Sequence, residues 1–216
     1  MSPRKRVGVL ISGRGSNLQA LIDACLAPDF PAEIVTVISN RPGAFGLERA
    51  REAGIAGVTI DHKRHKSRES FDAALDAALR DAGVELICSA GFMRLLTPGF
   101  TEAWRDRQLN IHPSLLPAFR GLHPHERALE MGVRLSGATV HFVRAEMDAG
   151  PIILQAVVPV LGDDTPDSLA ARVLAAEHVI YPRALGLIAS GKAWVEGETV
   201  RFASPELARP VFLPET

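Results

Sequence analysis

The stretch "RVGVLISGRGSNLQALIDACL" (6–26) combines an apolar run, a glycine turn and an amphipathic segment. Its first part, 6–12, is short and almost wholly apolar, which is typical of a strand buried on both faces of a parallel sheet. Its last part, 17–26, places leucine and isoleucine at the spacing of one helix face. A buried strand that leads through glycines into a helix favours a doubly wound α/β fold.

The same alternation continues through the first half of the chain. Apolar runs predict strands at 33–40, 56–61 and 85–92. Amphipathic segments that end at glycines predict helices at 44–54 and 67–83. Strands separated by helices in this way indicate parallel pairing through crossover connections.

The second half departs from this pattern. Two strands joined by the short segment "RAEMDAGPI" (144–152) should be antiparallel neighbours. The elements predicted here are a strand at 108–112, a helix at 125–132, strands at 137–143 and 153–160, a helix at 165–191 and a hairpin at 192–202. The Leu116–Pro117 bond, in a rigid turn between these elements, is expected to be cis.

These patterns predict an α/β fold with a doubly wound, mostly parallel, Rossmann-like sheet. We expect an antiparallel strand in the C-terminal half and helices flanking the sheet. The sequence contains no internal repeat and no linker that would divide it. We therefore expect a single domain over 1–216, with an N-terminal half of about 1–105 and a C-terminal half of about 106–216.

Composition limits the classes of partner. The 216 residues carry a formal net charge of −1, which gives no reason to expect nucleic acid or an anionic membrane as a partner. No segment approaches the roughly 20 apolar residues that span a bilayer, and no signal peptide is visible. Cys25 and Cys88 lie in apolar surroundings, as free buried thiols in a reducing compartment do. We expect a cytoplasmic protein.

The glycine turn after the first strand is a candidate phosphate site. A helix that starts near Ser16 offers free backbone N–H groups, and glycines let an anion approach them. Leu18 stands where the dinucleotide fingerprint requires a third glycine, so that motif is absent. Two interpretations stay open, a phosphate held by Gly15, Ser16 and Asn17 or a plain tight turn.

Three polar side chains form a candidate catalytic group. Asn110 and His112 alternate at the end of a short strand, so their side chains project to the same side. Asp148 lies in the connection between the two later strands. An amide N–H can stabilise an oxyanion, a histidine can carry a proton, and a carboxylate can orient it. Addition to a carbonyl fits this set, although both strand residues could instead only hydrogen-bond the loop.

A metal site is the rival interpretation of the histidines. His112, His123 and His125 cluster in the sequence. No cysteine near them completes a tetrahedral ligand set. We therefore expect no functional metal.

Several longer segments of the sequence resemble those of a known family. The segments "LNIHPSLLPAFRGLHPHERAL" (109–129) and "VHFVRAEMDAGPIILQ" (140–155) closely resemble the folate-dependent phosphoribosylglycinamide formyltransferases, also called glycinamide ribonucleotide transformylases. The match extends from Val7 to about Gly191 through "VLISGRGSNLQALIDA", "FGLERAREAGI", "LICSAGFMRLL" and "EHVIYPRAL". The wider formyl-transfer family shares the Asn-x-His-x-Ser-Leu-Leu-Pro core.

The resemblance implies a reaction of purine biosynthesis. The formyl group of 10-formyltetrahydrofolate, a co-substrate, would pass to the amine of glycinamide ribonucleotide, with no metal required. Asn110 would be the oxyanion donor and His112 the second stabiliser and proton carrier. Asp148 would keep His112 charged and order a water for proton transfer.

The resemblance also implies binding residues. The N-terminal half would bind nucleotide phosphate, and the C-terminal half would bind folate and carry catalysis. The implied contacts are Gly15, Ser16 and Asn17 for the substrate phosphate; Glu177 for the ribose; Gly91 and Pro113 for the glycinamide; Met93, Arg94, Leu95, Leu96, Val143 and Ala145 for the pterin; and Arg68 for the glutamate tail of folate. One departure concerns Leu174, where the family can carry glutamine, so that a ribose or phosphate contact is lost or is taken over by Arg172.

Three other functions are compatible with parts of the sequence. A formyltetrahydrofolate hydrolase shares the polar trio but would carry an added N-terminal regulatory domain, whereas the first strand here is predicted at 6–12. A methionyl-tRNA formyltransferase would carry a C-terminal β-domain and a basic surface, which the near-zero charge disfavours. A nonenzymatic ligand-binding protein of this fold is the third alternative. We expect small-molecule partners and a monomer or homodimer.

Overall fold

The computed structural model describes residues 3–213 of the chain. Two compact units make up the chain, Met1–Asn110 and Ile111–Thr216. The predicted boundary between the two halves of the chain is near residue 105, whereas the boundary between the two units falls within strand β5 (Gln108–His112). Among the described residues, no helix combines the length and apolar character needed to cross a bilayer.

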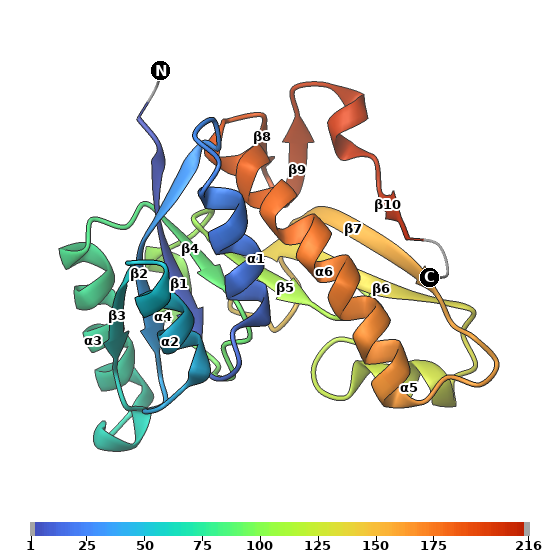
Figure 1. The fold of residues 1–216 in the computed structure, drawn as a ribbon, viewed down its shortest axis with the longest axis horizontal. Coiled ribbons are helices and arrows are strands. Elements are labelled where there is room, and N and C mark those ends of the chain that lie inside the picture. Colours follow the sequence, from blue (N-terminus) through green and yellow to red (C-terminus); the bar gives the residue numbers. More distant parts are fainter. Residues whose placement is uncertain (1–2, 214–216) are drawn as a thin grey trace. The chain divides into compact units, whose positions relative to one another are not determined.

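The first unit is built on parallel strands. The order across the sheet is β3-β2-β1-β4-β5, and every pair in it is parallel. These strands are β1 (Lys5–Ile11), β2 (Ala32–Ser39), β3 (Ala56–Thr59), β4 (Leu86–Ser89) and β5 (Gln108–His112). Because the chain winds outward from β1 in one direction and then returns through β4 in the other, the predicted doubly wound arrangement is confirmed (Figure 1).

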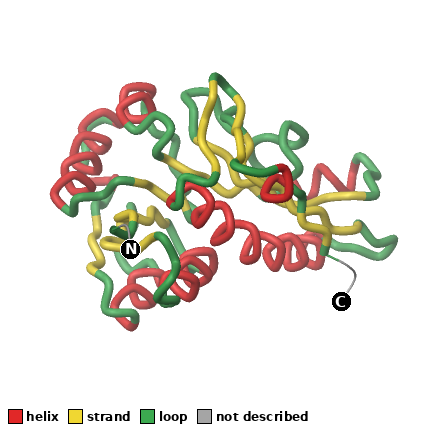
Figure 2. The backbone as a smooth tube through the Cα atoms, turned by 90° about the horizontal axis from the view of Figure 1, so that it is seen from above, coloured by secondary structure: helices red, strands yellow, loops and turns green. Residues whose placement is uncertain are grey.

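Helices lie on both sides of these strands (Figure 2). They are α1 (Ser16–Cys25), α2 (Phe45–Glu52), α3 (Arg68–Asp81) and α4 (Pro98–Ala103), with a 3-10 turn, η1 (His62–Arg64). Ser67 caps α3 and exchanges hydrogen bonds with Ser70 in a capping box. Helices α3 and α4 contribute Phe71, Leu75 and Phe100 to a core that also contains β1, β2 and β4.

The second unit contains an antiparallel pair. Strands β6 and β7 pair in opposite directions, as predicted from their short connection, and β10 pairs with β7 in parallel. The elements of this unit are α5 (Pro124–Glu130), β6 (Leu135–Phe142), β7 (Ile152–Pro159), α6 (Pro166–Ala189), β8 (Ala193–Glu196), β9 (Thr199–Phe202), η2 (Pro205–Ala208) and β10 (Val211–Phe212). The predicted hairpin is β8–β9, and α6 packs along β6 and β7 (Figure 1).

Several element boundaries differ from the sequence prediction. Strand β3 ends at Thr59 rather than at residue 61, and β4 ends at Ser89 rather than at residue 92. Gly91, two residues after the end of β4, adopts a positive φ of 75°, so the predicted strand cannot continue to residue 92. The Leu116–Pro117 bond is cis, as expected.

An ion pair anchors the start of α6. Arg172 donates to both carboxylate oxygens of Asp164, at 2.7 and 3.0 Å, and to the carbonyl of Pro159. The hydroxyl of Ser168 and the backbone N–H of Leu161 also donate to Asp164. The Arg172 guanidinium, followed by these two hydrogen bonds, holds the pKa of Asp164 well below its usual range despite burial. This carboxylate therefore stabilises the native state in its ionised form.

Asp164→Asn should lower the free energy of unfolding at pH 7 by about 2 kcal/mol, because hydrogen bonds to charged groups are lost. The folded pKa lies below the unfolded value, so this stabilisation is present above the unfolded pKa, near 4, and is lost as pH falls through it toward the folded pKa. Urea denaturation of both proteins from pH 7 to pH 3 checks this. A difference that stays constant over that range would contradict the assignment.

Candidate active site

The end of strand β5 presents two of the predicted catalytic residues. Asn110 is half-buried, and His112 is buried with 7% of its surface exposed. They lie two residues apart on one strand, so their side chains project from the same face. The carboxyl end of a parallel strand is where open α/β sheets place their ligands.

His112 is held between a carboxylate and a carbonyl group. Its Nδ1 lies 3.4 Å from Oδ2 of Asp148, and its Nε2 lies 3.1 Å from the backbone oxygen of Phe119. Both neighbours are acceptors, and the contact with Asp148 is an ion pair whenever the imidazole is protonated. The structure therefore brings together His112 and Asp148, which are thirty-six positions apart in the sequence.

Asp148 lies in the loop between β6 and β7 with a positive φ of 52°. Its side chain is 10% exposed, and its Oδ2 accepts a hydrogen bond from the backbone N–H of Gly121 at 2.9 Å. Positive φ is uncommon outside glycine and is found at functional sites. The loop thus holds this carboxylate close to the imidazole in a specific backbone conformation.

His141 is a neighbour of Asp148 that the sequence prediction did not include. Its Nε2 lies 3.7 Å from Oδ1 of Asp148, and its Nδ1 lies 2.9 Å from the Phe142 carbonyl. Burial lowers the pKa of His141, outweighing the Phe142 hydrogen bond and the charge of Asp148, which both raise it. The sequence shows a histidine on the strand that precedes the loop of Asp148. It does not show the register of that strand against β7, which decides where the side chain of His141 lies.

A network of side chains fixes the turn that follows His112. The hydroxyl of Thr139 donates to the carbonyl of Ser114 at 2.7 Å and accepts from the N–H of Leu116 at 3.0 Å. Gln155 donates to the Leu116 carbonyl at 2.9 Å, and Ser114 donates to the Ala118 carbonyl at 2.6 Å. Ser114 is thus committed to its own turn, as expected for a serine flanked by prolines.

Thr139→Val should lower the free energy of unfolding by about 1–3 kcal/mol, because Leu116 N–H would remain buried without its acceptor. Thr36→Val is the matched control, since Thr36 is also buried on a strand but makes one long hydrogen bond of 3.4 Å, to Ala56. Chemical denaturation measures both effects. Equal losses in the two variants would show that the turn does not depend on Thr139.

The predicted phosphate loop lies at the start of α1. Gly15 has a positive φ of 71° and precedes the first helical residue, Ser16. A Cβ atom at Gly15 would lie 2.8 Å from Cα of Gly46, so only glycine fits this turn. In the described part of the chain, no side chain caps this helix terminus. Asn17 follows and is buried.

The segment after β4 carries the predicted folate residues of the first unit. The N–H of Met93 donates to the hydroxyl of Ser12 at 2.8 Å, which places this segment beside the loop after β1. The guanidinium of Arg94 lies over the ring of Phe71, 5.1 Å from its centroid. Arg68 donates to the carbonyl of Leu96 at 3.0 Å. Leu95 and Met93 remain exposed, by 61% and 62%, so apolar surface is available to a ligand.

The remaining predicted residues belong to the second unit or to the loop after β4. Pro113 directly follows His112, and Gly91 has a positive φ of 75°. Val143 and Ala145 precede Asp148 in its loop, and Glu177 is buried on α6. Arg172 donates to both carboxylate oxygens of Asp164, and whether it also replaces the contact expected at Leu174 stays a prediction.

The described residues, 3–213, contain no group of three or more histidine, cysteine, aspartate or glutamate side chains that could hold a metal ion. His123 instead faces Glu126, with Nδ1 3.2 Å from the carboxylate. Asn110, His112 and Asp148 carry groups that can stabilise charge and transfer protons.

Comparison with known proteins identifies the family. The Formyl transferase model matches residues 5–185, which include Asn110, His112 and Asp148. The chain belongs to the formyl transferase family. It is 47% identical over 197 residues to a phosphoribosylglycinamide formyltransferase of Escherichia coli, covering 88% of this chain and 93% of that protein.

A solved structure and a longer protein are also similar to this chain. The crystal structure of glycinamide ribonucleotide transformylase 1 from Symbiobacterium toebii is 51% identical and superposes with a TM-score of 0.92, covering 94% of this chain and 96% of that one. The human trifunctional purine biosynthetic protein adenosine-3 is 52% identical over 188 residues, which cover 87% of this chain. The chain spans 14–19% of the length of this and five similar animal trifunctional proteins.

Proposed function

We propose that this chain transfers the formyl group of 10-formyltetrahydrofolate to the amine of glycinamide ribonucleotide, giving formylglycinamide ribonucleotide and tetrahydrofolate in purine biosynthesis. The observation that carries the proposal is the placement of His112 beside Asp148, 3.4 Å apart, at the end of the strand that bears Asn110. Family membership adds the class of reaction. Relatives named for this activity match most of the chain.

The reaction begins when the amine nitrogen attacks the formyl carbon. A bond forms between that nitrogen and the carbon, and the carbonyl oxygen gains negative charge. The side-chain N–H of Asn110 and a protonated His112 would stabilise this oxyanion. Hydrogen bonds of Ser114 and Thr139 hold the turn that directly follows His112, so little reorganisation of this segment is needed as charge develops.

The intermediate then releases folate. The bond between the formyl carbon and N10 of the folate breaks, and a proton passes from the former amine to that nitrogen. We infer that Asp148 supports this transfer, because it lies 3.4 Å from the imidazole of His112 and accepts a hydrogen bond from the N–H of Gly121. The proton balance requires no metal and no oxidant.

The binding roles divide between the two substrates. We assign the substrate phosphate to Gly15, Ser16 and Asn17, because a helix terminus with a close glycine approach suits an anion. The other assignments are Glu177 for the ribose; Gly91 and Pro113 for the glycinamide; Met93, Arg94, Leu95, Leu96, Val143 and Ala145 for the pterin; and Arg68 for the glutamate tail. A cytoplasmic location and the choice between a monomer and a homodimer remain predictions.

An acceptor comparison tests this function. The purified chain is incubated with 10-formyltetrahydrofolate and either glycinamide ribonucleotide, water alone or charged initiator tRNA. We expect rapid tetrahydrofolate release with glycinamide ribonucleotide only. Formate release at the same rate without the ribonucleotide would instead assign a hydrolase, and preference for tRNA would assign the other transferase.

A further inference from the structure

The loop between β6 and β7 requires accurate placement if Asp148 acts on the substrate. This loop, 143–151, also contains Val143 and Ala145, which are assigned to the pterin. At Gly150 the loop backbone approaches the end of β6 so closely that a Cβ atom would lie 1.8 Å from the Phe142 carbonyl oxygen. Small shifts of the loop would therefore move both the carboxylate and the folate contacts.

Arg144 connects this loop to the C-terminal hairpin. Its Nε donates to Oε2 of Glu198 at 2.9 Å, and its Nη1 donates to the carbonyl of Val143 at 3.1 Å. The Arg144 side chain is 11% exposed, whereas Glu198 is 59% exposed. A guanidinium that has lost most of its water depends on the acceptors that replace it.

The hairpin that carries Glu198 is held by contacts with the rest of the second unit. Glu198 lies in the turn of the β8–β9 hairpin next to Gly197, which has a positive φ of 65°. The N–H of Ala203 donates to the carbonyl of Lys192 at 2.9 Å and closes the base of the hairpin. Strand β8 packs against α6, and β9 packs against β7.

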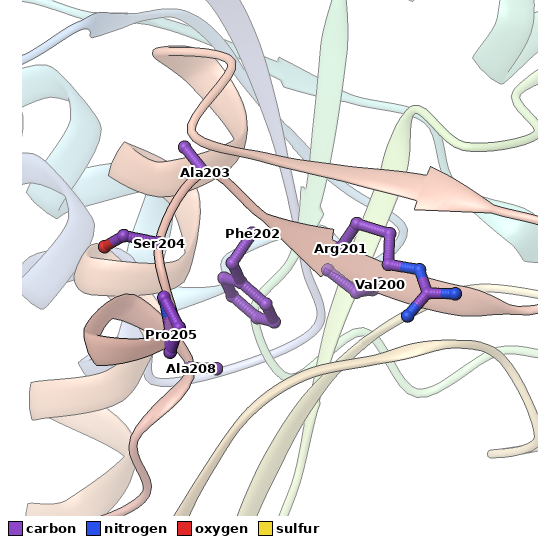
Figure 3. Close-up of a pocket in the computed structure, with 7 residues that line it drawn as sticks. All are labelled: Val200, Arg201, Phe202, Ala203, Ser204, Pro205 and Ala208. Atoms are coloured by element: carbon purple, nitrogen blue, oxygen red, sulfur yellow. The ribbon is translucent and has the colours of Figure 1, made fainter.

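The segment after β9 adds a second anchor. Phe202, the last residue of β9, lines the same pocket as Pro205 and Ala208 of the η2 segment, whereas the side chain of Arg201 extends away from it (Figure 3). Arg183 of α6 donates to the carbonyl of Leu207 at 3.3 Å. The pocket drawn in Figure 3 is lined by residues of β9 and of the segment after it, and by none of the candidate site residues.

We propose that Arg144 and Glu198 are a positioning pair, through which the C-terminal hairpin holds the 143–151 loop in the conformation that presents Asp148 and the pterin contacts. This inference rests on the proposed function for its consequence in catalysis. Glu198 lies outside residues 5–185, which the family model matches, so the pair adds to the chemistry that the family implies. Neither residue is expected to touch the reacting atoms.

The test replaces Glu198 with glutamine, which keeps the shape of the side chain and removes its charge. Amide hydrogen exchange of the peptide covering 143–151 and steady-state kinetics are measured on the full chain. We expect exchange in this peptide to rise and kcat to fall, each by about fivefold, the scale of a single ion pair of moderate exposure. The melting temperature should change little.

Glu196→Gln is the matched control, because Glu196 is also an exposed carboxylate of this hairpin, but its ion pair is with Arg201, at 2.7 Å, within the hairpin itself. It should leave both exchange and kcat unchanged. A double variant with the charges swapped, Arg144→Glu with Glu198→Arg, should recover part of the kcat that each single substitution loses. Recovery separates a positional role from a general loss of stability.

Two results would overturn the proposal. One is equal exchange of 143–151 in the Glu198→Gln and Glu196→Gln variants, and the other is faster exchange with unchanged kcat. A wild-type chain without activity on glycinamide ribonucleotide would refute the proposed function instead. The exchange comparison would then still decide whether the ion pair holds the loop.

Discussion

Asp148→Asn is expected to lower kcat by about 100-fold or more, because an amide can neither balance the charge of an imidazolium nor accept a proton. The fold should persist, since the asparagine oxygen can still accept the hydrogen bond from Gly121 N–H. Steady-state turnover with glycinamide ribonucleotide and 10-formyltetrahydrofolate measures the effect.

The control for this variant is Asp164→Asn. Asp164 is also a buried carboxylate, but it binds Arg172 and lies at the start of α6. We expect the reverse pattern there, with lower stability and nearly normal kcat. Comparable turnover in the wild type and the Asp148→Asn variant would remove Asp148 from the mechanism.

Asn110→Ala is the second change with a large expected effect. Loss of one oxyanion donor typically costs about 100- to 1000-fold in kcat, and Asn110 is the amide at the end of β5. The KM values for both substrates should change much less, because the donor acts on charge that develops during the reaction.

Asn110→Asp provides a test of the donor itself. This variant keeps the size of the side chain but replaces its N–H donors with an acceptor. It should be as inactive as Asn110→Ala at neutral pH. A nearly active aspartate variant would show that the side chain positions neighbours and does not stabilise an oxyanion.

The local part of this fold was predictable from the sequence. An apolar run located β1, which is buried from Val7 to Ile11, and helical periodicity located α1 and α3, which bury the face that their periodicity defines. Helix α4 was missed, since it has six residues and no room for a periodic stripe, although Thr97 and Pro98 are a start signal. Strand β10 has two residues and depends on pairing with β7.

The candidate site was predictable only in part. Asn110, His112 and Asp148 stood out because polar residues follow short strands, and the resemblance gave them roles. The contacts of His141 with Asp148 and of Arg144 with Glu198 depend on strand register and on a hairpin fifty-four residues downstream. Such contacts join segments that no local pattern relates, so they become visible only in the folded chain.

The proposed function requires that a formyl group leaves 10-formyltetrahydrofolate and appears on the amine of glycinamide ribonucleotide. The most direct measurement follows ¹³C-labelled formyl from 10-formyltetrahydrofolate by NMR in a single turnover with excess chain and glycinamide ribonucleotide. We predict that the label appears in the amide of formylglycinamide ribonucleotide, and that Asp148→Asn slows its appearance. Label found in free formate, or label left on folate, would contradict the claim.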